Sequence, residues 1–317
     1  MNPNNRPTLD DLAVFVAVAE SDGFSAAARR LHASKAMVSV AISRLEAQLG
    51  VKLFQRTTRR ISLTEAGQAM LPHAQRSMLA ARDAEEAATE TRTSPRGELR
   101  VNAPMSFGLK HVVPALGDFA SAHSEIRVDL VLDDRVLDLV EGGFDLALRI
   151  GALSDSGLIA HRLATSYNVL VAHPEYLSRV GRPTTPAALK AHATLLYSLS
   201  STAARWVLTK GSKTESIAVR PLLRANSGMA LLEASKQGLG IASVPRFLVG
   251  EELAQGSLVQ VLADWTLPEH GIFALTTARD HVPRKTRAFI DFFRARIGSP
   301  PYWERGRTKA PGKGKRS

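Results

Sequence analysis

The sequence has no cysteine and no long run of apolar residues. Without cysteine there can be no disulfide framework and no thiolate metal site. Without an apolar run of about 18 residues, no segment is predicted to cross a bilayer. The N-terminal residues also lack a basic segment followed by an apolar core, so no signal peptide is predicted. We therefore expect a cytoplasmic protein with no membrane partner.

Motifs that mark common enzyme classes are also missing. The chain has no GxSxG elbow, no Walker loop and no HExxH helix. The nine histidines are scattered, with none paired at a metal-binding spacing. Gly238-Leu239-Gly240 falls between an expected helix and an expected strand and is no dinucleotide fingerprint. The sequence therefore predicts no catalysis, no cofactor and no metal site.

Basic residues are abundant and concentrated in two stretches. The 317 residues carry a formal net charge of +11 and have a length that favours two or three domains. Between residues 29 and 60, eight Lys and Arg stand against Glu46; from Pro301 onward, six stand against Glu304. Such concentration is expected of a phosphate-binding surface, although a surface that only aids solubility would have the same composition.

The N-terminal region has the pattern of three helices. Apolar residues at three- and four-residue spacing predict a helix over 9–19. Ser25 is expected to cap a short helix that ends at Leu31, and Ser34 to cap a third helix that ends at Gly50. Two capped helices joined by a tight turn are the packing unit of a helix-turn-helix.

A helix-turn-helix reads DNA by inserting its second helix into the major groove. On that helix, the residues predicted to face DNA are Ser34, Lys35, Ala36, Met37, Ser39, Val40 and Ser43. Serine and lysine can donate hydrogen bonds to bases or phosphates, and methionine and valine can contact thymine methyl groups. The alternative is a three-helix core with no role in DNA binding.

A basic hairpin follows, with arms at Leu53-Phe54 and Ile61–Leu63. The residues predicted to lie against flanking phosphates are Arg56, Thr57, Thr58, Arg59 and Arg60. The basic hairpin favours DNA binding over a three-helix core with no role in DNA binding. We expect Lys35→Ala to change base preference and Arg59→Ala to weaken binding to all sequences about equally.

A long helix and an α/β region make up the rest of the chain. Thr64 is expected to cap a helix that continues to about Thr93. It carries a heptad-like seam of Met70, Ala74, Ser77, Ala81, Ala84 and Ala88. Beyond Ser94-Pro95 the pattern alternates, which predicts an α/β domain with a largely parallel sheet. Its expected helices are 106–122, 136–141, 228–237 and 285–296; its expected strands are 99–103, 126–132, 144–150, 167–172, 194–197, 206–209, 241–244 and 272–276.

The chain resembles the LysR-type transcriptional regulators. The N-terminal match runs without a gap from Leu12 to Ala74 and includes FVAVAE, GFSAAARRLH, ISRLE, LGVKLFQR and LTEAG. VNAPMSFG, the stretch 144–163 and EASKQGLGIASVP extend the resemblance to about residue 297. The chain departs from many relatives at Lys35, Ala36 and Val40, which are expected to face the groove, so the resemblance does not imply an operator sequence.

The resemblance implies a division of the chain and a set of partners. The parts are a winged helix-turn-helix domain at 1–65 (helix-turn-helix at about 25–44), a linker and dimerisation helix at 66–95, an effector-binding domain at 96–300 and a basic disordered tail at 301–317. The effector domain would be similar to type 2 periplasmic binding proteins, with one α/β subdomain at about 96–166 and 272–297 and the other at about 167–271. The implied partners are double-stranded DNA, a second copy through the linker helix with assembly to a tetramer, RNA polymerase and a small-molecule co-inducer.

Effector-binding residues are expected where strands lead into helices. Ser106 follows a strand and begins a helix, where free N–H groups attract an anion. The predicted cleft residues are Ser106, Phe107, Arg149, Asn226 and Ser227. As alternatives, the serine and asparagine would be helix caps and the arginine a surface ion pair. The predicted effector is a small anionic or aromatic metabolite.

The sequence thus predicts a sequence-specific transcriptional regulator that responds to an effector. Two other classes share part of the pattern. A solute-binding protein would have the same C-terminal fold but needs export, and no export signal is present. An architectural DNA binder would fit the basic tail but would bind with little sequence preference and steep salt dependence.

Overall fold

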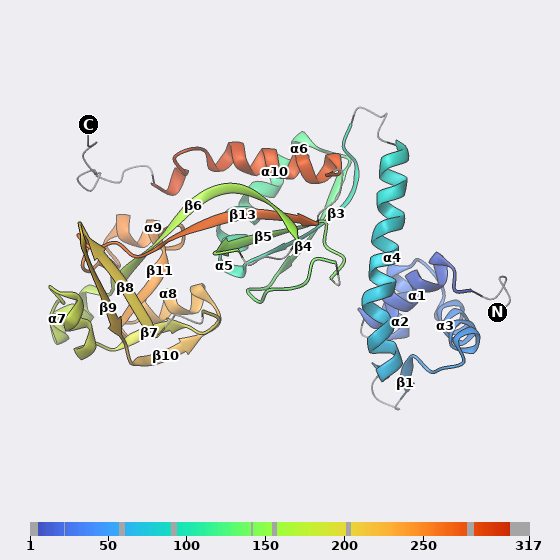
Figure 1. Ribbon diagram of the computed structural model, residues 1–317, viewed down its shortest axis with the longest axis horizontal. Helices are drawn as coiled ribbons and strands as arrows, with labels where there is room; N and C mark the ends of the chain where they lie inside the picture. Colours follow the sequence, from blue (N-terminus) through green and yellow to red (C-terminus); the bar gives the residue numbers. More distant parts are fainter. Residues whose placement is uncertain are drawn as a thin grey trace. The chain divides into compact units, whose positions relative to one another are not determined.

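The computed structural model describes residues 6–21, 23–56, 61–89, 94–140, 142–153, 157–200, 204–277 and 282–304. The chain divides into two compact units (Figure 1). The first contains residues 1–94, with 137–145 and 281–284. The second contains residues 95–136, 146–280 and 285–317. Among the described residues, no helix is both long and apolar enough to span a membrane.

The first unit is a helical bundle with a small hairpin. Its elements are α1 (Leu9–Ala19), α2 (Phe24–Arg30), α3 (Lys35–Leu49), β1 (Phe54–Arg56), β2 (Ile61–Leu63) and α4 (Glu65–Thr89). The predicted caps of α3 and α4 are confirmed: Ser34 accepts the Met37 N–H at 3.2 Å, and Thr64 accepts the Gly67 N–H at 3.0 Å. Gly50 ends α3 in the left-handed conformation. The predicted Ser25 cap is wrong, because α2 begins at Phe24 and Ser25 lies inside it.

The start of α4 packs closely on the chain that follows α3. A Cβ atom added to Gly67 would lie 2.2 Å from the backbone oxygen of Leu53, so only glycine fits there. Further along α4, Ala74 is buried and Met70 is partly buried in the core around Phe15. Two residues of the predicted heptad seam therefore pack inside their own unit.

The second unit is built on one mixed sheet. Its strands are β3 (Gly97–Ala103), β4 (Ile126–Leu132), β5 (Leu146–Gly151), β6 (Leu158–Ala172), β7 (Thr194–Tyr197), β10 (Pro221–Ala225), β11 (Ile241–Pro245), β12 (Val259–Gln260) and β13 (Glu269–Thr277). The order is β10-β7-β11-β6-β13-β5-β3-β4, with β12 beside β6. Pairing is parallel at each end of the sheet, and the long antiparallel strands β6 and β13 lie side by side between the ends (Figure 1).

Helices and a separate hairpin surround this sheet. A continuous helical segment comprises α5 (Met105–Phe107), a π-turn (Gly108–Val112), a 3-10 turn (Val113–Ala115) and α6 (Leu116–Ala122). The other elements are α7 (Pro174–Val180), a 3-10 turn (Pro186–Ala191), the hairpin β8 (Arg205–Lys210) with β9 (Lys213–Ala218), α8 (Gly228–Lys236), α9 (Arg246–Gln255), α10 (Arg284–Ile297) and a 3-10 turn (Tyr302–Glu304).

The sheet is mixed and not largely parallel as predicted, because β6 and β13 pair antiparallel with their neighbours. Three further predictions for the α/β region also differ from the structure. Residues 136–140 form no helix; the Gly142-Gly143 pair that was expected to end one lies in a turn instead. The expected strand at 167–172 is only the second part of the continuous strand β6. The tail expected from residue 301 begins with an ordered turn, because Trp303 packs on the main core.

Candidate nucleic-acid interface and ligand pocket

The outer face of α3 is a surface that the core leaves free. Val38, Ile42 and Leu45 point inward and are buried. The residues predicted to face DNA lie on the opposite side, where Met37 and Val40 are 65% and 66% exposed. Apolar side chains this exposed stabilise nothing within the unit, and they are suited to contact with thymine methyl groups.

A buried carboxylate holds α3 against α1. Asp11 has a side chain only 1% exposed and pairs with Arg44 of α3. Burial alone would raise the pKa of Asp11, but hydrogen bonds from the Thr8 backbone and from Arg44 outweigh this and lower the pKa. The ion pair therefore fixes the orientation of the exposed face of α3.

A second buried carboxylate attaches the hairpin to α3. Glu46 accepts the backbone N–H groups of Leu53 and Phe54 at 3.0 and 3.2 Å and pairs with Lys52 at 2.7 Å. Burial opposes ionisation, yet these donors hold the pKa of Glu46 below its ordinary value. The sequence analysis did not assign a role to Glu46. The one signal that could have indicated such a role is that Glu46 is the single acidic residue in the basic stretch 29–60.

Of the residues predicted to contact phosphates, Arg56 alone lies within the described part of the chain. Arg56 ends β1 and pairs in register with Ile61 of β2. Thr57, Thr58, Arg59 and Arg60 lie outside the described residues.

The second unit has a pocket of about 260 Å³ beyond the carboxyl ends of β4 and β10. It is lined by Met105, Leu132, Asp133, Asp134, Arg135, Asn226 and Ser227. The sequence predicted Asn226 and Ser227 and missed the three charged residues. The missed signal was their position directly after a strand, since ligands of parallel sheets bind outside the carboxyl ends of strands.

At each of the two helix starts beside the pocket, one backbone N–H already donates to a side chain of the protein. The Met105 N–H donates to Asp134 Oδ1 at 2.9 Å, and the Met229 N–H donates to Ser106 Oγ at 3.2 Å. The Met105 N–H, the first of this helix, is therefore not free for an anion. Asp134 takes the position in which an anion would bind, and burial together with the charge of Asp133 raises its pKa.

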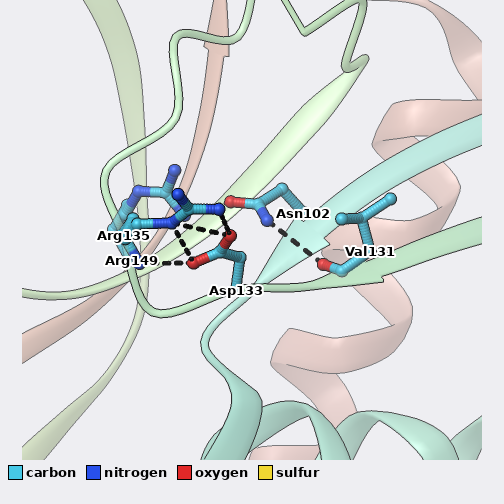
Figure 2. Close-up of polar contacts among 5 residues, drawn as sticks. All are labelled: Asn102, Val131, Asp133, Arg135 and Arg149. Carbon is cyan, nitrogen blue, oxygen red and sulfur yellow. Dashed lines mark hydrogen bonds and ion pairs between the residues drawn. The ribbon is translucent and has the colours of Figure 1, made fainter. Parts of the chain in front are cut away.

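A charged cluster lies beside the pocket (Figure 2). Arg149 donates to Asn102 Oδ1 at 2.5 Å, and the Asn102 amide donates to the Val131 carbonyl at 3.1 Å. The Arg135 guanidinium donates hydrogen bonds to both carboxylate oxygens of Asp133 at 2.6–3.1 Å. Burial lowers the pKa of Arg149, and the charge of Asp133 acts against that shift. The predicted Arg149 is thus held at the sheet by Asn102 and lies near Asp133.

Phe107, also predicted for the cleft, has no exposed surface. Its ring lies 5.0 Å from that of His111 and 5.2 Å from that of Phe247. His111 Nε2 donates to the Phe247 carbonyl at 3.1 Å, so Nδ1 accepts a hydrogen bond from the Tyr302 hydroxyl. Burial lowers the pKa of His111 to about 4. Phe107 is therefore part of an interior cluster and not of the pocket lining.

A helix-turn-helix unit joined to an α/β unit with a pocket defines the class of ligand-responsive DNA-binding proteins. Residues 9–68 match the family described as bacterial regulatory helix-turn-helix protein, lysR family. Residues 92–298 match the LysR substrate binding domain. The chain belongs to the LysR-type transcriptional regulators. It is accordingly a DNA-binding transcriptional regulator with an effector-binding domain.

Individual relatives agree over almost the whole length. The transcriptional regulator PtxR of Pseudomonas aeruginosa is 36% identical over 94% of this chain and 96% of its own. The structure of CrgA, a LysR-type regulator from Neisseria meningitidis, is 33% identical with a TM-score of 0.61, over 92% of this chain and all of its own. Full-length AphB, a Vibrio cholerae virulence activator, is 32% identical with a TM-score of 0.59, over 90% of this chain and 98% of its own. Since the relatives are regulators, the chain is no enzyme.

Proposed function

We propose that α3 contacts the bases of the operator through Lys35, Met37 and Val40. The hairpin would bind the flanking phosphates. The observation that carries this proposal is that Met37 and Val40 of α3 are exposed, whereas Val38 and Ile42 of the same helix are buried. The ion pair of Asp11 and the contacts of Glu46 support it, because they hold α3 against α1 and attach the start of β1 to α3. This activity takes place in the cytoplasm, on double-stranded DNA.

Self-association through α4 is the second part of the proposal. Because Met70 and Ala74 are occupied in the unit's own core, the seam offered to a second copy begins at Ser77 and continues through Ala81 and Ala84. Small residues at heptad spacing allow two helices to approach closely. The dimer would assemble further to a tetramer and contact RNA polymerase, as the family implies.

The third part of the proposal concerns the effector. A small molecule, a co-inducer, would enter the pocket at the carboxyl ends of β4 and β10 and contact Asn226 and Ser227. The pocket volume lies just below the range of about 300–1,000 Å³ that is usual for small-molecule sites, which favours a compact metabolite. Strands β6 and β13 support the proposed division into subdomains at 96–166 with 272–297 and at 167–271, since each runs from one half to the other.

Gel-shift titration tests the DNA part. The full chain is titrated against its own upstream region and against random DNA at physiological salt. We expect much tighter binding to the upstream region. Arg59→Ala should weaken binding to both DNAs about equally. Equal affinity of the unaltered chain for the two DNAs would refute the proposed function.

A thermal-shift screen of the full chain tests the effector part. A ligand of the pocket should raise the unfolding temperature, and the rise should continue with the logarithm of the ligand concentration above its dissociation constant. In the Ser227→Ala or Asn226→Ala variant the same ligand should give a smaller shift. A shift that both variants retain in full would place the ligand elsewhere.

A further inference from the structure

The pocket at the carboxyl ends of β4 and β10 contains a carboxylate that has no counter-ion among the described residues. Asp134 lines this pocket, is partly buried and accepts the Met105 N–H at Oδ1. In the described part of the chain no donor contacts its other oxygen, Oδ2, and no Lys or Arg forms an ion pair with it. Burial, followed by the charge of Asp133, raises the pKa of Asp134. The pocket lining thus includes a negative charge that a cationic ligand can neutralise.

The two arginines near the pocket are already engaged by the protein itself. The Arg135 guanidinium donates to both carboxylate oxygens of Asp133 (Figure 2). Arg149 donates to Asn102 Oδ1 and to the Leu148 carbonyl. The hydrogen bonds from Arg135 and the charges of both arginines hold the pKa of Asp133 below its ordinary value. An anionic ligand would therefore have to compete with Asp133 for these arginines.

The negative charge of the pocket also acts on a residue of β7. Burial, followed by the charges of Asp134 and Asp133, raises the pKa of Tyr197 to about 12. Tyr197 is the last residue of β7, the strand that pairs with β10. The two carboxylates are therefore effective beyond their own strand, although both arginines lie close to Asp133.

A metal ion is the other class of cation that a carboxylate attracts. Among the described residues, no group of three or more His, Cys, Asp or Glu side chains is placed to hold a metal ion. The pocket volume of about 260 Å³ is also much larger than a bare ion needs and suits a compact organic molecule. An ammonium group on a short carbon chain fits both observations.

We propose that the pocket binds a compact primary amine whose ammonium group pairs with Asp134. The carbon chain of the amine would lie against Met105 and Leu132, and a polar far end would bond Asn226 or Ser227. A partly buried carboxylate without a counter-ion is destabilising, and a cationic ligand offsets this on binding. The inference rests on the proposed role of this pocket as the effector site, and it replaces the anionic ligand that the sequence predicted.

Two matched sets of probes test which charge the pocket selects. Ethanolamine and aminobutanol are cationic, ethylene glycol and butanediol are their neutral counterparts, and glycolate and hydroxybutyrate are their anionic counterparts. Each probe is titrated into the full chain by calorimetry, with thermal unfolding as the second readout. We expect saturable binding of an amine at millimolar concentration and none of the glycols or acids. Preference for an acid, or no response to either amine, would overturn the proposal.

Two matched variants test the role of Asp134. Asp134→Asn removes the charge and keeps an oxygen that can accept the Met105 N–H, so the fold should persist. It should weaken binding of the amine by about 10- to 150-fold, the contribution of a hydrogen bond to a charged group. The control Asp264→Asn removes an exposed aspartate that pairs with Lys210 and should leave binding unchanged. Equal losses in the two variants would overturn the proposal, because the amine would then respond only to net charge.

Magnesium is the probe for the competing class of cation. Mg²⁺ is added to the full chain in the presence of the amine that binds. An amine signal that Mg²⁺ leaves in place supports the assignment. Displacement of the amine by an equal or lower concentration of Mg²⁺ would overturn it, because the site would then prefer a metal ion.

The ligand assignment and the proposed function fail in different experiments. The amine that binds is added to the gel-shift titration on the upstream region. Loss of amine binding in Asp134→Asn, with no effect of the amine on DNA affinity, would refute the effector role and leave the ligand assignment standing. A glycol or an acid that binds the pocket and changes DNA affinity would support the effector role and overturn the assignment.

Discussion

The two units differ in how far apart along the chain their hydrogen-bond partners lie. In the helix-turn-helix unit, Glu46 takes its donors from residues within eight positions along the chain. In the effector-binding unit, the Ser106 hydroxyl accepts from Met229, which is 123 residues away, and His111 meets Tyr302 across 191 residues. Other contacts of the first unit span 33 residues (Arg44 to Asp11) and 55 residues (Gln75 to Glu20). The first unit is thus braced over shorter separations along the chain than the second, whose contacts span more than 100 residues.

The largest loss of unfolding free energy is expected when the contacts of Glu46 are removed. Glu46→Ala would leave the buried N–H groups of Leu53 and Phe54 without their acceptor, which should cost about 3 kcal/mol of unfolding free energy. Urea unfolding measures this cost. Lys52→Ala is the matched control and should cost less than about 1 kcal/mol, because the Lys52 side chain is largely exposed. Equal losses in the two variants would show that the salt bridge, and not the backbone contacts, is what matters.

The next effect tests the long-range contacts through pH. His111 has its pKa lowered to about 4 in the folded chain, against an ordinary value of 6.5, so the unfolded state binds more protons between these values. Stability is therefore full above about pH 6.5 and falls as pH drops toward 4, by about 2 kcal/mol between pH 7 and pH 5.

The comparison variant for this experiment is His111→Asn, with unfolding measured at each pH. The nearby charges of Lys110 and Glu251 act on this pKa in opposite directions, and the Tyr302 hydroxyl bonds the ring. The variant should lose this part of the pH dependence whatever its absolute stability. An unchanged slope would mean that His111 is not the group responsible.

A smaller effect is expected at the helix starts beside the pocket. Asp134→Ala removes the acceptor of the Met105 N–H, and Ser106→Ala removes that of the Met229 N–H. Each should cost about 1 kcal/mol, as the loss of a helix cap does. Asp134→Asn keeps an acceptor oxygen and should lose less. If Asp134→Ala and Ser106→Ala both unfold like the unaltered chain, these contacts do not hold the pocket together.

The difference between the units explains what the sequence could predict. The Ser34 cap, the Gly50 stop and the face of α3 depend on residues within one or two helical turns, so periodicity was enough. Glu46 escaped notice because its partners are backbone groups, which leave no pattern in the sequence. At the pocket, Asp134 accepts the Met105 N–H of α5 and Ser106 accepts the Met229 N–H of α8. The two partners of each bond lie far apart along the chain, so nothing in the sequence indicated that these N–H groups have acceptors. The packing of Trp303 on the main core was missed because the basic residues after it suggested a disordered tail from residue 301.

The central claim is that the exposed face of α3 selects the operator, and one competition experiment tests it directly. The full chain, Lys35→Ala and the control Lys190→Ala, an exposed lysine of the effector-binding unit, are each titrated on the upstream region with random DNA as competitor. Lys35→Ala should reduce the preference for the upstream region by about 5- to 150-fold, the effect of one lost base contact, and Lys190→Ala should leave it unchanged. An unchanged preference in Lys35→Ala, with both DNAs weakened alike, would contradict the claim.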